Sequence, residues 1–422
     1  MKKEHVLHVG FHASEAHAID FDRDIVTAVM PRASAARLPE DLAVRFARIA
    51  VVDLPDTDDL ELYDRASDEM CARAVELAAE FGPPTAIVGL YEHTTLPAAR
   101  MRELFGLSGT TVRTATLCRD KVPMKQVLAD AGVPVPRFLA VGPDIPHAEL
   151  AAFAASLPGR VVVKPRSQGA SIGVRILDDA AALLALAAEG GLEEGTEAEE
   201  FVAGTIYHFD GVVRDGEIQW FSAAKYLDSC FSFQYEDVPL ASVTLDDPGL
   251  VLRSWEFTES VLAAIGLTDS AFHLEAFHTP DDELVFLEIG NRFGGAGVPW
   301  LQRAIFGVDM AREALLACLG RPSELPAPAT VLDHSGAAGW LYMPLAEKQP
   351  CKVTGIAGLD TLPASVVLTA TPGVGFHMNA RTDTWPTAGR FLLLAETTAA
   401  VEADMAKIAD SYAITTTTTG GP

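Results

Sequence analysis

The stretch that decides the fold is residues 273–297, HLEAFHTPDDELVFLEIGNRFGGAG. Apolar runs on both sides of an acidic centre predict a β-hairpin that turns at Asp281 and Asp282. If the turn is centred between them, Glu275 faces Glu288, and directly opposed residues have Cβ atoms about 4.5 to 5.5 Å apart. If the register slips by one residue, one of these glutamates points to solvent instead.

Two carboxylates held this close repel each other unless a cation lies between them. Oxygen-rich sites that share phosphate oxygens suit Mg2+, so the hairpin predicts a magnesium site. Arg292 follows, and it either holds a carboxylate or phosphate through two hydrogen bonds or is a surface residue beside a turn. Gly294 and Gly295 would let a substrate lie against the backbone.

Upstream, residues 161–177 (VVVKPRSQGASIGVRIL) place Lys164 at the end of a β-branched run, before a loop of small residues. Backbone amides of such a loop can approach an anion, and its hydroxyls add donors. A Walker loop has its lysine after the glycines and before a helix, whereas here the lysine comes first and a strand follows. The loop is therefore a phosphate loop of another kind or a flexible hairpin. Its candidate ligand-binding residues are Ser167, Gly169, Ser171 and Gly173.

A second hairpin is predicted within residues 198–227, with its turn at Asp215 and Gly216. That turn places Lys225 opposite Ile206, on the face that also carries His208 and Asp210. A lysine, a histidine and an aspartate on one face could contact phosphate or substrate, although a solvated sheet face explains them almost as well.

The composition limits the function classes. The chain has 422 residues, of which 49% are hydrophobic and 21% charged, and this predicts a folded protein of several domains. A net charge of -26 without a basic patch argues against nucleic acid and anionic membranes as partners. No signal peptide is expected, and five scattered cysteines fit neither a disulfide framework nor a zinc site, so we expect a cytoplasmic protein.

Short apolar strands alternate with Ala-rich helical patterns up to about residue 116, which predicts an α/β unit with a parallel sheet. The proline-dense residues 321–330 mark a boundary before a smaller α+β unit. Residues 415–422, TTTTTGGP, have nothing to bury and are expected to be disordered.

With these segments in this order, the chain resembles the ATP-grasp superfamily over nearly its whole length. It is most similar to the carboxylate–amine ligase branch, the L-amino acid ligases. Residues 111–138 look like the family's entry segment, residues 199–204 (EEFVAG) like its interdomain hinge, and the C-terminal unit like the small last domain of L-amino acid ligases. The resemblance implies the following organisation: a Rossmann-like pre-ATP-grasp domain at 1–116, an ATP-grasp domain at 117–320 with a flexible lid at about 158–203, a small α+β domain at 321–414, and the tail.

The resemblance also assigns roles to single residues. Lys121 and Lys164 would reach the phosphates of ATP, beneath a flap formed by the small-residue loop. Glu275 and Glu288 match paired Mg2+ ligands, a site that Mn2+ would also fit. Asn291 stands one residue later than the asparagine that many relatives use as a further ligand.

At the hinge, the backbone of Glu200 and Val202 would read the adenine edge, with Glu199 and Phe201 beside them. The position that aligns with the ribose-binding glutamate of D-alanine:D-alanine ligases is Ile206, so Asp210 becomes the candidate for the ribose.

The implied reaction is ATP-dependent ligation of a small acid to an amine, with amino acids as the expected substrates and an acyl phosphate as the intermediate. Arg292 would steady the acyl phosphate, and Lys225 would contact phosphate or substrate. The loop around Ser171 would close to exclude water. His208 or His273 would serve as the base for the amine. The alternatives are an ATP-grasp enzyme that activates another acid such as bicarbonate, and a nucleotide-binding module without turnover. By analogy with relatives, a homodimer is one assembly to test.

Overall fold

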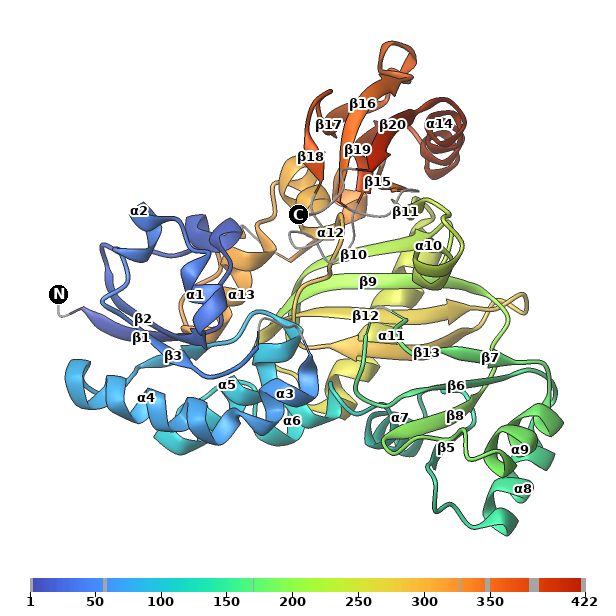
Figure 1. Ribbon diagram of the computed structural model, residues 1–422, viewed down its shortest axis with the longest axis horizontal. Helices are drawn as coiled ribbons and strands as arrows, with labels where there is room; N and C mark the ends of the chain where they lie inside the picture. The colour runs from blue at the N-terminus through green and yellow to red at the C-terminus, as the bar shows by residue number, and fades with distance from the viewer. Residues whose placement is uncertain are drawn as a thin grey trace.

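The computed structural model describes residues 3–55, 59–169, 171–325, 328–345, 350–378 and 387–418. Figure 1 shows a parallel sheet at the N-terminus, a large central sheet, and a smaller sheet with its helices beside the central one. Among the described residues, no helix is both long and apolar enough to cross a membrane.

The N-terminal unit is the predicted α/β layer. Its four parallel strands run in the order β3-β2-β1-β4, so the order reverses between β1 and β4. Most side chains of these strands are apolar where helices cover both faces, as in other buried parallel strands, although His8 and Thr27 are also buried. Its elements are β1 (Glu4–Val9), η1 (Ala13–Ala18), β2 (Asp24–Pro31), α1 (Arg32–Ala36), α2 (Glu40–Ala43), β3 (Arg48–Val52), α3 (Leu60–Arg65), α4 (Ser67–Phe81), β4 (Ala86–Val88), α5 (Glu92–Phe105) and α6 (Val112–Leu117).

The predicted lid, about residues 158–203, is part of a unit that begins earlier, at β5. This unit has a separate antiparallel sheet of order β5-β8-β6-β7, here called the lid sheet, with two helices packed on one another. Val161, Val163 and Ala198 point from this sheet into a core that the helices complete with Leu150 and Leu183. The elements are β5 (Phe138–Val141), α8 (His147–Ser156), β6 (Val161–Pro165), β7 (Arg175–Leu177), α9 (Ala180–Ala188) and β8 (Thr196–Glu200).

A sheet with nine described strands forms the centre of the molecule, in the order β13-β12-β9-β10-β11-β15-β19-β17, with β14 paired to β10. Helices α7 (Lys121–Asp130) and α11 (Pro248–Ile265) bury one face over an aromatic core that includes Phe209, Phe221 and Phe272. The strands are β9 (Thr205–Arg214), β10 (Glu217–Tyr226), β11 (Leu240–Thr244), β12 (Ser270–His278), β13 (Leu284–Gly290), β14 (Ala329–Thr330), β15 (Ala337–Pro344), β17 (Val366–Ala370) and β19 (Thr387–Ala395).

The C-terminal unit continues this central sheet, because β15 pairs with β11 and carries β19 and β17 beyond it. A small sheet of order β18-β16-β20 completes the unit. The remaining elements are α10 (Cys230–Tyr235), α12 (Val298–Leu301), η2 (Gln302–Phe306), α13 (Met310–Cys318), η3 (Val331–Asp333), β16 (Cys351–Ala357), η4 (Leu359–Thr361), β18 (His377–Met378), α14 (Thr398–Ser411) and β20 (Ala413–Thr418).

The prediction that the disordered tail begins at residue 415 is wrong. Residues 415–418 belong to β20, which pairs antiparallel with β16 from Thr418 opposite Cys351 to Ala413 opposite Ala357. The threonines bury little surface, but β-branched side chains suit an extended backbone, and the ladder to β16 pairs the peptide groups that face it. Residues 419–422 lie outside the described residues.

Candidate active site

A cavity of about 890 Å³ lies between the lid sheet and the central sheet. Its walls come from β6, β8, β12 and β13, from the loop after β6, and from α10. Most of the predicted site residues line it: Lys121, Lys164, Gly169, Ser171, Glu199, Glu200, Phe201, Val202, His273, Glu275, Glu288, Arg292 and Gly295. Ser167 lines a hollow of about 40 Å³ that shares Lys121, Glu288 and Arg292 with this cavity.

The hairpin β12–β13 pairs Glu275 with Glu288, as predicted, although the expected turn is wrong. The turn is longer than two residues and pairs His278 with Leu284 across it. An irregularity next to Glu275 then adds Leu287 as an extra residue on β13, which brings the two glutamates opposite each other. Both carboxylates reach the cavity, with side chains 13% and 27% exposed.

The surroundings of the two carboxylates fit a hard divalent cation. Burial alone would raise the pKa of Glu288, but Lys121 and Lys164 lower it below its ordinary value, so this carboxylate is ionised. The Nζ of Lys121 lies 3.1 Å from Glu288 Oε2, and Glu275 Oε1 lies 3.3 Å from His273 Nε2. Two carboxylate ligands that share a cavity with two lysines are a donor set that Mg2+ uses together with phosphate oxygens.

Asn291, the predicted third ligand, does not join the pair. Side chains alternate along a strand, so Gly290 shares the face of Glu288 while Asn291 points to the other side. A Cβ built on Gly290 would lie 2.9 Å from Glu92 Oε2, whereas the buried Oδ1 of Asn291 has no hydrogen-bond partner among the described residues. The one-residue shift thus removes Asn291 from the cavity wall.

The two predicted phosphate lysines approach the cavity from different elements. Lys121 begins α7, whose N-cap Asp120 accepts a hydrogen bond from Val122 N and a two-pronged ion pair from Arg166 at 2.9 and 2.5 Å. Lys121 Nζ donates to the Gln168 carbonyl in the loop at 2.6 Å. Arg166 therefore ties the end of β6, which carries Lys164, to the start of the helix that carries Lys121.

The loop after β6 lies over the cavity. Ser171 has a φ of 59°, and its carbonyl accepts a hydrogen bond at 3.5 Å from the hydroxyl of Tyr235 in α10. Gly173 does not line the cavity; its φ is +72° and a Cβ there would lie 2.9 Å from the ring of Pro165. Glycine is needed at this position because a side chain would meet both strain and a clash.

The hinge segment, which the resemblance assigns to adenine, lines the cavity. Phe201 N donates to the Arg160 carbonyl at 3.1 Å, and the Arg160 guanidinium carbon lies 3.6 Å from the Phe201 ring centre. Glu200 N is occupied by the Arg137 carbonyl at 2.8 Å. A wall of apolar ring and main chain at the edge of a polar cavity suits a flat heteroaromatic ligand.

The predicted convergence of Lys225 with His208 and Asp210 is wrong. An irregularity between Ile218 and Trp220 shifts the register, so Lys225 pairs with Tyr207 and points to the opposite face of the sheet. Its Nζ lies 2.6 Å from Glu402 Oε1 on α14.

Asp210 and His208 are both buried and do not line the cavity, so the structure does not place Asp210 where a ribose could reach it. Asp210 lies between two imidazoles, 2.6 Å from His208 Nδ1 and 2.8 Å from His273 Nδ1. Gly294 packs over this group, since a Cβ there would lie 2.4 Å from Asp210 Oδ1. Burial alone would lower the pKa of His273, but Asp210 raises it to about 9, so His273 is a cation near neutral pH and not a free base.

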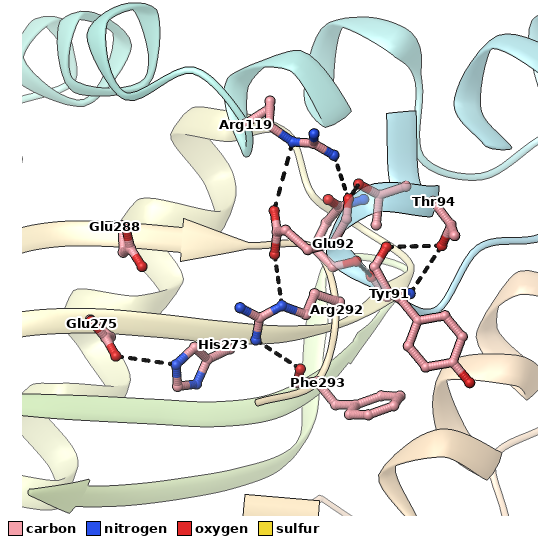
Figure 2. A network of polar contacts seen from close by, with 12 residues as sticks. Tyr91, Glu92, Thr94, Arg119, His273, Glu275, Glu288, Arg292 and Phe293 are labelled. Carbon is pink, nitrogen blue, oxygen red and sulfur yellow. Dashed lines mark hydrogen bonds and ion pairs between the residues drawn. The ribbon is translucent and has the colours of Figure 1, made fainter. Parts of the chain in front are cut away.

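Residues that the sequence did not single out complete the site (Figure 2). Glu92, at the start of α5, accepts a hydrogen bond from Arg292 Nε at 2.7 Å, and Arg292 Nη1 donates to the Phe293 carbonyl at 2.9 Å. Arg119 contacts Glu92 from the other side. Glu92 follows β4 at the edge where the strand order reverses, which is where open α/β sheets hold their functional side chains.

Comparisons with known proteins bear on the fold and on the sequence as a whole. No protein-family model matches the sequence. The chain is 27% identical over 297 residues to an L-arginine-specific L-amino acid ligase of Bacillus subtilis, covering 68% of this chain and 70% of the relative. The structure matches that of an L-amino acid ligase from Bacillus licheniformis with a TM-score of 0.72 and 17% identity, over 98% of this chain and 99% of that one. The chain has the ATP-grasp fold.

The ATP-grasp fold is also shared with proteins of other activities. The biotin carboxylase domain of Hydrogenobacter thermophilus 2-oxoglutarate carboxylase, in complex with MgADP and bicarbonate, matches with a TM-score of 0.66 and 15% identity over 99% of this chain and 92% of that one. At this identity the match speaks for the fold alone. The predicted fold class, an α/β ATP-grasp chain, is therefore confirmed.

Proposed function

We propose that the chain is an ATP-dependent carboxylate–amine ligase that forms an amide or peptide bond through an acyl phosphate, with amino acids as its substrates. The observation that carries the proposal is one cavity lined by Lys121, Lys164, the pair Glu275 and Glu288, and Arg292. The relation to the L-arginine-specific ligase supports amino acids over other acids.

The lysines and the hairpin would position the triphosphate. Lys121 and Lys164 would contact phosphate oxygens, and the two glutamates would hold Mg2+, which neutralises phosphate charge when bound. Phosphoryl transfer depends mainly on such positioning and charge neutralisation. The substrate carboxylate would attack the γ-phosphorus and release ADP.

Arg292 would hold the acyl phosphate while the amine attacks. Glu92 and the Phe293 carbonyl fix the direction of its guanidinium group, and the negative charge of Glu92 raises its pKa even though burial lowers it. The loop that carries Ser171 would keep water from the acyl phosphate, which would otherwise hydrolyse. Since His273 is already protonated, it would serve as a fixed cation beside Glu275.

A phosphate-release screen tests the proposal. Purified protein with ATP and Mg2+ is offered each of the common amino acids in pairs, with pairs that contain L-arginine first, and bicarbonate is offered in parallel. We expect phosphate release that needs two amino acids and yields a dipeptide by mass spectrometry. Release that depends on bicarbonate alone, or on no acid at all, would contradict the proposal.

A further inference from the structure

Beneath the cavity, two lysines and two glutamates form a buried cluster, which we call the charge quartet: Lys125, Lys164, Glu197 and Glu199. Lys125 comes from α7, Lys164 from β6 and the glutamates from β8, three elements that lie together in Figure 1. All four side chains are buried, and those of Lys125 and Glu197 are 0% exposed. The positive and negative charges balance.

The two glutamates share one face of β8 because they are two residues apart. Lys125 Nζ lies 2.8 Å from Glu197 Oε1 and 2.5 Å from Glu199 Oε2. Lys164 Nζ lies 2.5 Å from the other oxygen of Glu199 but 3.8 Å from Glu197 Oε1. Lys125 is therefore the close partner of both carboxylates, whereas Lys164 is close to only one.

The quartet has an inner end and a cavity end. Lys164 and Glu199 line the cavity, whereas Lys125 and Glu197 do not. Glu197 also has a buried Oε2 without a hydrogen-bond partner among the described residues, so it depends on its cationic neighbours. Although burial raises the pKa of Glu199, Lys164 and Lys125 hold it at about 2, so this carboxylate keeps its charge.

We infer that Lys125 is a positioning residue: it neutralises Glu197, and thereby leaves Lys164 at the cavity end to bind the nucleotide. Without Lys125, the one remaining cation would have to serve two buried carboxylates, because an unpaired buried charge is strongly unfavourable. Lys164 would then move toward Glu197 and away from the cavity. This inference rests on the proposed nucleotide role of Lys164.

The test measures the Kd of ADP with Mg2+ by calorimetry for the wild type, Lys125→Met, Glu197→Gln and the double variant. We expect Lys125→Met to weaken ADP binding at least tenfold. Glu197→Gln removes the need for the second cation, so it should bind ADP at least as tightly as the wild type. The double variant should bind within threefold of Glu197→Gln.

A matched control separates positioning from general stability. Arg321 is another buried cation that holds two carboxylates, Asp24 at 2.5 Å and Glu4 at 2.6 Å, away from the cavity. Arg321→Met should lower the melting temperature but leave the Kd of ADP within twofold.

Two results would overturn the inference. One is a folded Lys125→Met variant with the wild-type Kd; the other is a double variant that binds ADP more than tenfold weaker than Glu197→Gln. If Lys125→Met does not fold, the comparison of the double variant with Glu197→Gln still tests the inference. A wild type that does not bind ADP would instead refute the proposed function itself.

Discussion

Replacing Glu92 with alanine should lower the rate of ligation, because Glu92 is the carboxylate that directs Arg292. The Nε–Oε2 distance is 2.7 Å, and the two side chains are only 23% and 25% exposed. A hydrogen bond between charged groups contributes about 1.5 to 3 kcal/mol, which corresponds to a loss of about 10- to 150-fold in kcat/KM. Glu92→Gln keeps a hydrogen-bond acceptor but not the charge, so its kcat/KM should lie between those of Glu92→Ala and the wild type.

The assay is ADP release with the best substrate pair from the screen, measured over a range of acid and ATP concentrations. The loss should appear in kcat/KM for the acid, while the Kd of ADP should stay within threefold. Glu103→Gln is the matched control, because Glu103 lies on the same helix, is exposed, and accepts a hydrogen bond from Val112 N at 3.2 Å. A Glu92→Ala variant with a kcat/KM within twofold of wild type would refute the proposed role of this contact.

Three further predictions follow from the same geometry. In the folded protein the pKa of His273 is raised to about 9, so its pairing with Asp210 stabilises the fold fully below about pH 6.5. This stabilisation is lost as the pH rises through 9. Over this pH range the melting temperature should therefore fall more steeply for the wild type than for His273→Gln. Lys225→Met should keep kcat/KM within twofold, because Lys225 lies on the other face of the sheet. In denaturant titrations it should change the free energy of unfolding by less than about 1 kcal/mol, because the ion pair of Lys225 with Glu402 is partly exposed. Gly173→Ala should lower the free energy of unfolding by about 1 to 2 kcal/mol in the same titrations, because the φ of Gly173 is positive. It should also slow ADP release in the enzyme assay. Unchanged kinetics would show that the loop tolerates the side chain.

The sequence was most informative where a function depends on residues close together in the chain. The pairing of Glu275 with Glu288 could be predicted from one hairpin, and it is correct because an extra residue on β13 compensates for a longer turn. The same reasoning failed for Lys225, where a similar irregularity near Gln219 turned the side chain to the other face. A single sequence does not reveal where a strand gains an extra residue, and one residue decides which face a side chain occupies.

The missed residues depend on contacts between distant segments. Glu92 meets Arg292 only because the N-terminal unit packs against the central sheet. Lys125 meets Glu197 and Glu199 only because α7 packs beneath the lid sheet. Periodicity predicts the helix and the strands separately, but it does not say which side chains meet between them.

The most direct test of the central claim is how much Mg2+ strengthens ADP binding in the wild type, in Glu275→Gln and in Glu288→Gln. Glu283→Gln, an exposed residue at the turn of the same hairpin, is the control. If the opposed glutamates hold the metal, Mg2+ should tighten ADP binding at least tenfold in the wild type and the control, and less than threefold in the two variants. An undiminished effect of Mg2+ in both variants would contradict the account.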